Sequence, residues 1–391
     1  MVGEALGHGG VDVGTVTGVD VAEANVAGVD VAVVGAGIVG CMTAREVLAH
    51  RPDAAVAVVD RGLIGSGASR RSAGLHFPRG ASERVRRMSG LSERRYRELR
   101  AELPGLPVYD VDTTVVAHED SAERLREVYL PGAGLRPTAG LPAVLDRLPE
   151  GAGAWRVTGG QYADVQGVAQ ALAADLRPRV RFLEGSRVTG MASGPGAVEL
   201  ELSSGSSLRA DRVLLAPGPW LADPAWAHWL EPLGLRVKKV VALHIERRPS
   251  PGDGVVVFED EDAFLLPVHR RGHWLFSYTC PQWDVDPDRT QGHLTSVELA
   301  EAHGALGRLA PELLPLCTTG RVFCDAYSPD RAPVVRAVDP HRNVVFAGAA
   351  NGAGYRLAPA IAAQAAALLG PPSPSSTSTV PPRTVASRSF T

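Results

Sequence analysis

The chain has 391 residues, which is enough for one or two domains with substantial hydrophobic cores. Its formal net charge of -3, with 45% hydrophobic and 21% charged residues, is typical of a globular α/β protein and argues against a nucleic-acid or acidic-membrane partner. An apolar run of about 18 residues is absent, as is a signal-peptide pattern, so we expect a cytoplasmic protein without a membrane span. The four cysteines lack metal-binding spacing, which favours reduced thiols and no metal site.

The two ends of the chain differ in composition from the rest. Residues 1–27 are rich in Gly and Val, and Gly-Val-Asp-Val-like phrases recur at 10–13, 18–21 and 28–31, of which only the third leads into a strand pattern. Residues 371–391 are rich in Pro, Ser and Thr. Segments of this kind have too few large apolar side chains to build a core. We therefore expect a disordered leader and a disordered tail.

A strand, a glycine-rich turn, a helix and a second strand follow one another between residues 31 and 60. The first strand, Val31–Val34, is apolar throughout, and a G-x-G-x-x-G fingerprint follows at Gly35, Gly37 and Gly40. These glycines allow a tight turn, close approach of a pyrophosphate and close packing of the helix, whose N-terminus favours phosphate. The second strand ends at Asp60, twenty residues after Gly40. A carboxylate there can bind ribose hydroxyls and disfavours NADP, whose 2′-phosphate it would repel. This order of strand, glycine fingerprint, helix, strand and acid favours a dinucleotide site over a plain βαβ unit.

The segments after Asp60 change character twice. Residues 61–74 are mostly small, which suits a loop whose backbone lies against a ligand. Residues 79–100 are rich in Arg and Glu and predict a solvated helix with i,i+4 ion pairs, with an anion-binding patch as the alternative.

The rest of the chain predicts a second sheet and a return to the first. Alternating segments at 237–246, 255–258, 263–267 and 273–278 favour an antiparallel sheet. A strand at 343–348, a glycine-rich turn and an Ala-rich helix to about 369 end the folded part. Further strands are predicted at 113–117, 182–183, 187–191, 198–202, 207–210 and 211–216, and helices at 121–129, 168–176 and 295–309.

Several separated motifs resemble those of the D-amino-acid oxidase, glycine oxidase and sarcosine oxidase family (DAO) of FAD-dependent oxidoreductases. They cover residues 30–369 in the order found in that family. The motifs are 33–40 with Asp60, 67–69 leading to 72–74, 160–164, 210–220, 328–334 and 348–359.

The resemblance implies an α/β fold with a Rossmann-type, glutathione-reductase-like FAD domain built from discontinuous segments. We expect this domain to comprise 28–95, 156–232 and 320–370, and an antiparallel-sheet substrate domain to comprise 96–155 and 233–319. The implied reaction oxidises the C–N bond of an amine or amino acid by hydride transfer to flavin N5, and water then hydrolyses the imine. Oxygen or another molecule accepts the electrons.

The fingerprint and the resemblance together give the expected cofactor-binding residues. They are Gly35, Ala36, Gly37, Ile38, Val39, Gly40, Asp60, Arg61, Gly67, Ala68, Ser69, Ser72, Ala73, Gly74, Val188, Ala216, Gly218, Trp220, Asp330, Gly348, Asn351, Gly352, Gly354, Tyr355, Arg356 and Leu357.

The sequence departs from its relatives at three positions. Amino-acid-oxidising relatives often have an Arg for the substrate carboxylate where this chain has Asp325. Where sarcosine-oxidase-like members attach FAD through a Cys, this chain has Phe323, and Cys324 lies one residue along, so we expect noncovalent FAD. The strand 273–278 lacks the oxygen-activating Lys of those oxidases, which predicts slow reoxidation in air.

The lysines of the chain, Lys238 and Lys239, lie on an earlier strand, where we expect a structural cation. Arg356 falls where sarcosine-oxidase-like enzymes have a Lys for the substrate carboxylate, and it remains a candidate anchor. The candidate catalytic residues are Arg356, Asp325, Tyr278 and His273.

Two other functions stay open. One is a flavin dehydrogenase of a 2-hydroxy acid or amino acid that passes electrons to an acceptor other than oxygen. The other is a non-catalytic FAD-bound partner protein, which Asp325 and the missing Lys would permit.

Overall fold

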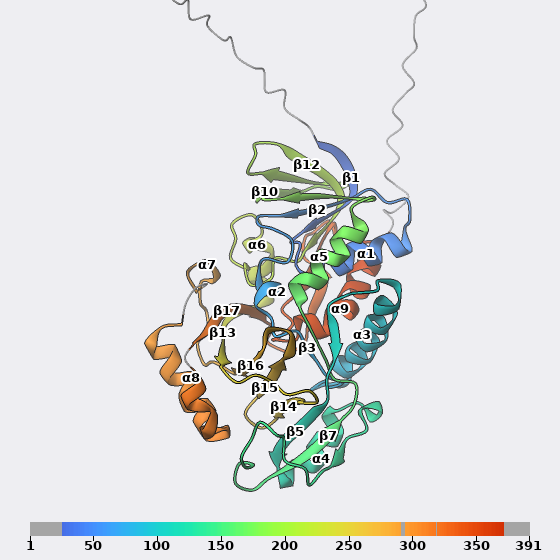
Figure 1. Ribbon diagram of the computed structural model, residues 1–391. Helices are drawn as coiled ribbons and strands as arrows, with labels where there is room; N and C mark the ends of the chain where they lie inside the picture. Colours follow the sequence, from blue (N-terminus) through green and yellow to red (C-terminus); the bar gives the residue numbers. More distant parts are fainter. Residues whose placement is uncertain (1–25, 291–293, 318, 371–391) are drawn as a thin grey trace, which may run out of the picture.

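The computed structural model describes residues 26–290, 294–317 and 319–370. The expected tail and nearly all of the expected leader lie outside this part of the chain. Two large sheets dominate the fold, with the first at the top of Figure 1, the second below it, and helices α2 (Ala68–Arg71) and α9 (Gly354–Leu368) between them. Within the described residues, no helix combines the length and apolar character that crossing a membrane requires.

The first sheet has a parallel centre. Its strand order is β10-β11-β12-β1-β2-β9, and β19 pairs with both β12 and β18. The predicted strands at 207–210 and 211–216 are in fact one continuous strand, β12, which explains why it pairs with β11 and β1 at once. The strands are β1 (Val26–Val34), β2 (Val56–Asp60), β9 (Val180–Glu184), β10 (Val188–Ser193), β11 (Val198–Leu202), β12 (Ser207–Leu215), β18 (Val334–Ala337) and β19 (Val344–Gly348).

Helices cover one face of this sheet and form the largest core. Val31 and Val33 of β1 are fully buried there, as the apolar run predicts for a strand between two layers. The predicted Arg-rich helix is α3, and it has exposed pairs such as Arg87 with Glu83 and Arg97 with Glu93. The covering helices are α1 (Ile38–His50), α3 (Glu83–Glu102), α5 (Val165–Leu176) and α9.

The second sheet is antiparallel except where β14 runs parallel to β5. Helix α8 (Ser296–Leu309) packs on one face, while the other face looks toward the small sheet β3-β8-β4. The third segment of the FAD domain was expected to begin at residue 320. Strand β17 instead belongs to the second sheet as far as Tyr327. The strands are β5 (Thr113–His118), β6 (Arg136–Pro137), β7 (Ala152–Val157), β13 (Arg236–Ile245), β14 (Val255–Phe258), β15 (Ala263–Val268), β16 (His273–Tyr278) and β17 (Thr319–Tyr327).

Short elements complete the fold. The small sheet consists of β3 (Leu75–His76), β4 (Val108–Asp110) and β8 (Gln161–Ala163). The short helices are α2, α4 (Ala122–Val128), α6 (Ala227–Leu230) and α7 (Pro287–Thr290).

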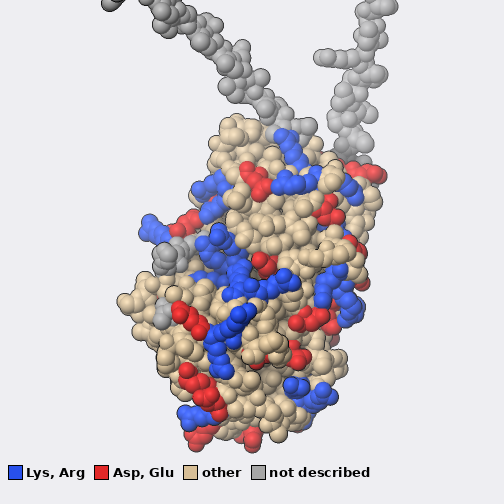
Figure 2. All heavy atoms as spheres, in the orientation of Figure 1, with Lys and Arg blue, Asp and Glu red and all other residues tan. Residues whose placement is uncertain are grey.

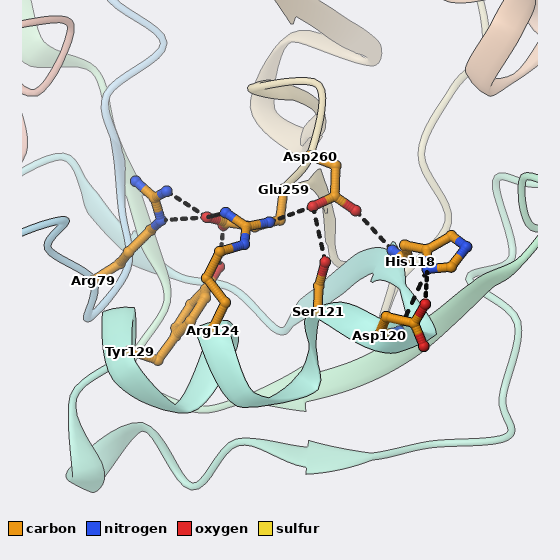
Figure 3. A network of polar contacts seen from close by, with 8 residues as sticks. All are labelled: Arg79, His118, Asp120, Ser121, Arg124, Tyr129, Glu259 and Asp260. Atoms are coloured by element: carbon orange, nitrogen blue, oxygen red, sulfur yellow. Dashed lines mark hydrogen bonds and ion pairs between the residues drawn. The ribbon is translucent and has the colours of Figure 1, made fainter.

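A buried ion pair ties the second sheet to the loop after β3 (Figure 3). Glu259 is buried and accepts a hydrogen bond from Nε of Arg79 at 2.9 Å and from the Tyr129 hydroxyl at 3.2 Å. Its neighbour Asp260 pairs with Arg124 at the surface. Because a buried charge is costly unless paired and hydrogen-bonded, these contacts hold the Arg79 loop in one position.

Candidate functional site

The glycine-rich turn after β1 is shaped by contacts that exclude side chains at two of its three glycines. Gly35 has φ of 105°, and a Cβ there would lie 2.3 Å from the carbonyl oxygen of Ala216. A Cβ at Gly40 would lie 1.9 Å from the carbonyl oxygen of Gly35. Gly37 differs, because its φ of -73° suits any residue and its Cβ would meet only Oγ of Ser69, at 3.3 Å. The fold thus requires Gly35 and Gly40, whereas Gly37 is open toward a cavity.

Asp60 connects this turn to the loop after β2. Its Oδ2 accepts the Ala36 N–H at 2.6 Å, and its Oδ1 accepts the Gly62 N–H at 2.7 Å. Each carboxylate oxygen retains a lone pair for a further donor such as a ribose hydroxyl. At the start of α1, Oγ of Ser69 accepts the Ile38 N–H at 3.0 Å, and Gly37 has no side chain to cap the helix. This helix N-terminus can therefore receive a phosphate.

A cavity of about 370 Å³, here the nucleotide cavity, extends from Asp60 to the start of α9. Most of the expected cofactor-binding residues line it. They are Gly35, Gly37, Ile38, Val39, Asp60, Arg61, Gly67, Ala68, Ser69, Ser72, Val188, Ala216, Gly218, Trp220, Gly348, Gly352, Gly354 and Tyr355. The lining that runs from Asp60 past the N-terminus of α1 to the start of α9 fits an FAD dinucleotide.

The other expected cofactor-binding residues lie elsewhere. Ala73, Gly74, Asn351 and Arg356 line a second cavity, described below. Ala36, Gly40, Asp330 and Leu357 line neither cavity. Asp330 forms a turn by accepting the Ser328 hydroxyl at 2.8 Å, and Leu357 is buried in the core.

The sequence reasoning missed several residues that line the nucleotide cavity. Most lie at the carboxyl ends of strands in the first sheet or a few residues beyond them, which is where such sheets bind ligands. That rule could have found Gly62, Ser66, Ser186, Arg187, Ala347, Ala349 and Ala350. Asp223 and Trp226 carried no comparable signal.

A second cavity of about 160 Å³, here the substrate cavity, lies between the second sheet and the start of α9. Asp325 lines both cavities, and its side chain makes no hydrogen bond or ion pair with the described residues. Burial raises the pKa of Asp325 from 3.8 to about 7. This carboxylate therefore changes its charge close to neutral pH.

Arg356 lines the substrate cavity as an unpaired cation. Its guanidinium lies 4.7 Å over the Phe77 ring, and Nε and Nη1 are buried without a hydrogen-bond partner among the described residues. Burial, and then the charge of Arg79, lower the pKa of Arg356 to about 10. Arg79 itself is paired with Glu259 on the same wall. A buried guanidinium with unpartnered donors suits a carboxylate.

The two lysines have different surroundings. Lys239 is the structural cation expected on this strand, because its Nζ pairs with Glu298 at 2.7 Å. Both lysines line the substrate cavity, but Nζ of Lys238 has no carboxylate partner among the described residues and lies 4.8 Å from the Trp283 ring and 5.5 Å from the Tyr327 ring. It makes no ion pair within the described part of the chain, and burial lowers its pKa. The sequence reasoning missed this residue.

The remaining candidates lie apart from Asp325 and Arg356. Tyr278 borders the substrate cavity but packs into the core beneath α8, with its hydroxyl buried and unpartnered. His273, at the other end of β16, is not among the residues that line either cavity. On β17, Phe323 lines the substrate cavity, whereas Cys324 is buried and lines neither cavity.

Comparisons with known proteins show the family and the fold. The family described as FAD dependent oxidoreductase (DAO) matches residues 30–368. Solved structures with a similar fold include glycine oxidase from Geobacillus kaustophilus (21% identity, 87% of this chain and 94% of that chain, TM-score 0.72). L-proline dehydrogenase from P. horikoshii is 18% identical, with 88% of this chain and 93% of that chain covered and a TM-score of 0.73. L-α-glycerophosphate oxidase from Mycoplasma pneumoniae is 16% identical, with 87% of this chain and 94% of that chain covered and a TM-score of 0.74. No curated protein matches the sequence.

Gly37→Val tests the cofactor site. The substitution is compatible with the backbone at Gly37 but places a side chain at the helix N-terminus, where the pyrophosphate binds. We expect a folded protein that purifies without the yellow colour of flavin, as measured by absorbance and circular dichroism. Gly40→Val is the comparison. A Cβ at this position would collide with the backbone of Gly35, so we expect this variant not to fold. A yellow Gly37→Val protein would contradict the assignment.

Proposed function

This chain belongs to the DAO family of FAD-dependent oxidoreductases, and from that premise we propose that it oxidises the C–N bond of a zwitterionic amino acid or related amine. The observation that carries the proposal is one small cavity with an unpaired buried Arg356 and an unpaired Asp325. A substrate with one carboxylate and one ammonium group would satisfy both charges. The alternative substrate, a 2-hydroxy acid, would pair with Arg356 but would offer Asp325 only a neutral hydroxyl.

Arg356 binds the substrate carboxylate in this proposal. One of its unpartnered donors, Nε or Nη1, donates a charge-assisted hydrogen bond to it, and the guanidinium rests over the Phe77 ring at 4.7 Å. Because these donors are buried, each charge-assisted contact contributes about 1.5–3 kcal/mol. The carboxylate, and with it the α-carbon, is thereby held in one orientation.

Asp325 accepts the proton of the substrate ammonium. A pKa near 7 makes this carboxylate a suitable base at neutral pH, because it is ionised before the substrate binds and can still hold the proton afterwards. FAD held in the nucleotide cavity would supply the hydride acceptor for the α-carbon of the neutral amine. Water converts the resulting imine to a carbonyl compound and ammonia.

Lys238 is the candidate cation for the oxidative half of the cycle. Reduction of oxygen develops negative charge, which a fixed cation in a poorly hydrated cavity stabilises. Strand β16 supplies no lysine, but Lys238 on β13 lies in the same cavity beside two aromatic rings that contact each other. We propose that it replaces the missing strand lysine, so that the protein acts as an oxidase.

An anaerobic screen of flavin reduction tests the function directly. We expect amino acids or N-methyl amino acids to bleach the flavin absorbance, and Arg356→Ala to raise KM about 10- to 100-fold through the lost charge-assisted contacts. Arg356→Lys should recover part of this loss. If only hydroxy acids reduce the flavin, the substrate class is wrong. If none of these compounds does, the protein is a non-catalytic FAD-bound partner.

The pH dependence of kcat/KM tests Asp325. Below a pH of about 7 the carboxyl is protonated and cannot accept the ammonium proton, so kcat/KM should rise with pH and level off above that value. Asp325→Asn should lower kcat/KM and remove this rise. Asp262→Asn is the control, because Asp262 lines the same cavity but its carboxylate is bonded to the Thr279 hydroxyl at 2.6 Å. If kcat/KM stops rising with pH in Asp262→Asn but still rises in Asp325→Asn, the base is Asp262 and the assignment of Asp325 is wrong.

The adjacent lysines provide a matched test of the oxidative half. Lys238→Met should slow reoxidation of the reduced protein by air at least about tenfold, because it removes a fixed charge from the cavity. Lys239→Met should leave that rate unchanged and lower the unfolding temperature, since it breaks the pair with Glu298. Stopped-flow absorbance measures both rates. Equal rates in the two variants would show that Lys238 has no part in the reaction with oxygen.

A further inference from the structure

Five basic side chains from distant parts of the chain come together outside both cavities. We call them the basic cluster. They are Arg71 on α2, His244 on β13, Arg271 in the turn His269–Arg271, His273 on β16 and Arg321 on β17. Figure 2 shows Lys and Arg gathered at the middle of one face, where Figure 1 has α2.

Strand register brings three of these side chains to one edge of the second sheet. His244 pairs with Leu275, two residues after His273, so both histidines lie on the same face, with ring centroids 4.9 Å apart. Arg321 pairs with Ala242, two residues before His244, and therefore shares that face. Nη2 of Arg321 donates to the Ser72 carbonyl at 3.4 Å, which places the end of α2 against the cluster.

The basic cluster has almost no negative charge to balance it. The only ion pair that its members form within the described residues joins Arg271 to Asp164, at 3.3 Å on the surface. Nε of Arg321 and Nε2 of His244 are buried without a hydrogen-bond partner. Burial, then Arg271 and Arg71, lower the pKa of Arg321 to about 10. Burial, then Arg321 and His273, lower the pKa of His244 to about 4.

Unrelieved repulsion of this kind destabilises a fold unless something supplies the opposite charge. We propose that the basic cluster is a binding site for a small anion that carries a carboxylate or phosphate group. Arg321, His244 and His273 are partly buried and form the floor, while Arg271 is exposed at the rim. A recessed floor of this kind suits a compact anionic group.

The anion site is separate from the site of oxidation. None of the five residues lines the nucleotide cavity or the substrate cavity, so neither the cofactor phosphates nor the substrate carboxylate at Arg356 accounts for them. Arg321 precedes Asp325 by four residues on the same strand, a span of about 13 Å. The proposal therefore stands even if the substrate class proposed above is wrong.

Anion titrations of the FAD-loaded protein test the site. Inorganic phosphate and succinate are added separately at constant ionic strength, with chloride as the balancing ion. We expect at least one of them to bind in calorimetry and to raise the unfolding temperature. Binding of phosphate alone indicates a phosphorylated ligand, and binding of succinate alone indicates a carboxylate. Absence of binding by both overturns the proposal.

Arg321→Met separates a specific site from a general salt effect. Removal of an unpaired, partly buried charge should raise the unfolding temperature without added anion and weaken anion binding at least about tenfold. Arg209→Met is the control, because Arg209 is exposed and paired with Glu199 far from the cluster. If Arg321→Met does not fold, Arg271→Ala replaces it, since its ion pair is exposed. Unchanged anion binding in the variant would overturn the proposal.

Discussion

The close backbone contact between Gly35, Gly40 and Ala216 is the constraint on which the site depends. It brings the ends of β1 and β12 together and directs the N-terminus of α1 along the cavity that they share. Because β19 pairs with β12, the same contact fixes where the chain leaves β19 and enters α9. Arg356 lies in the first turn of α9, so the position of the proposed carboxylate anchor follows from a packing requirement at the opposite end of the sequence.

The buried charges of this protein fall into two groups with different consequences. Glu259 is hydrogen-bonded to Arg79 and Tyr129, and Lys239 is paired with Glu298, so these charges support the fold. Among the described residues, Asp325, Arg356 and Lys238 lack such partners, and their burial costs folding free energy. The large cores on both sheets can offset that cost. Asp325, Arg356 and Lys238 gather on one cavity, as expected where binding a ligand supplies the missing partners.

The sequence predicted those parts of the fold that local patterns specify. The βαβ unit, the Arg-rich helix α3 and the antiparallel strands of the second sheet were confirmed, because each has a clear apolar period or turn signal. The continuity of β12 and the place of β17 in the second sheet were not predicted, since they depend on pairing between distant segments. The same reason explains why Lys238 was missed: only the sheet order shows that it faces the cavity.

The alternation of side chains along strand β17 determines which residues face the cavities. Arg321, Phe323 and Asp325 share one face, and they contribute in turn to the basic cluster, the wall of the substrate cavity and its acidic group. Cys324 faces the other way and is buried near α7, where Thr290 can hydrogen-bond its thiol. A flavin reached by Phe323 and Asp325 is therefore out of reach of the Cys324 sulfur, because alternate residues of a strand point to opposite faces. This geometry favours FAD that is held without a covalent bond.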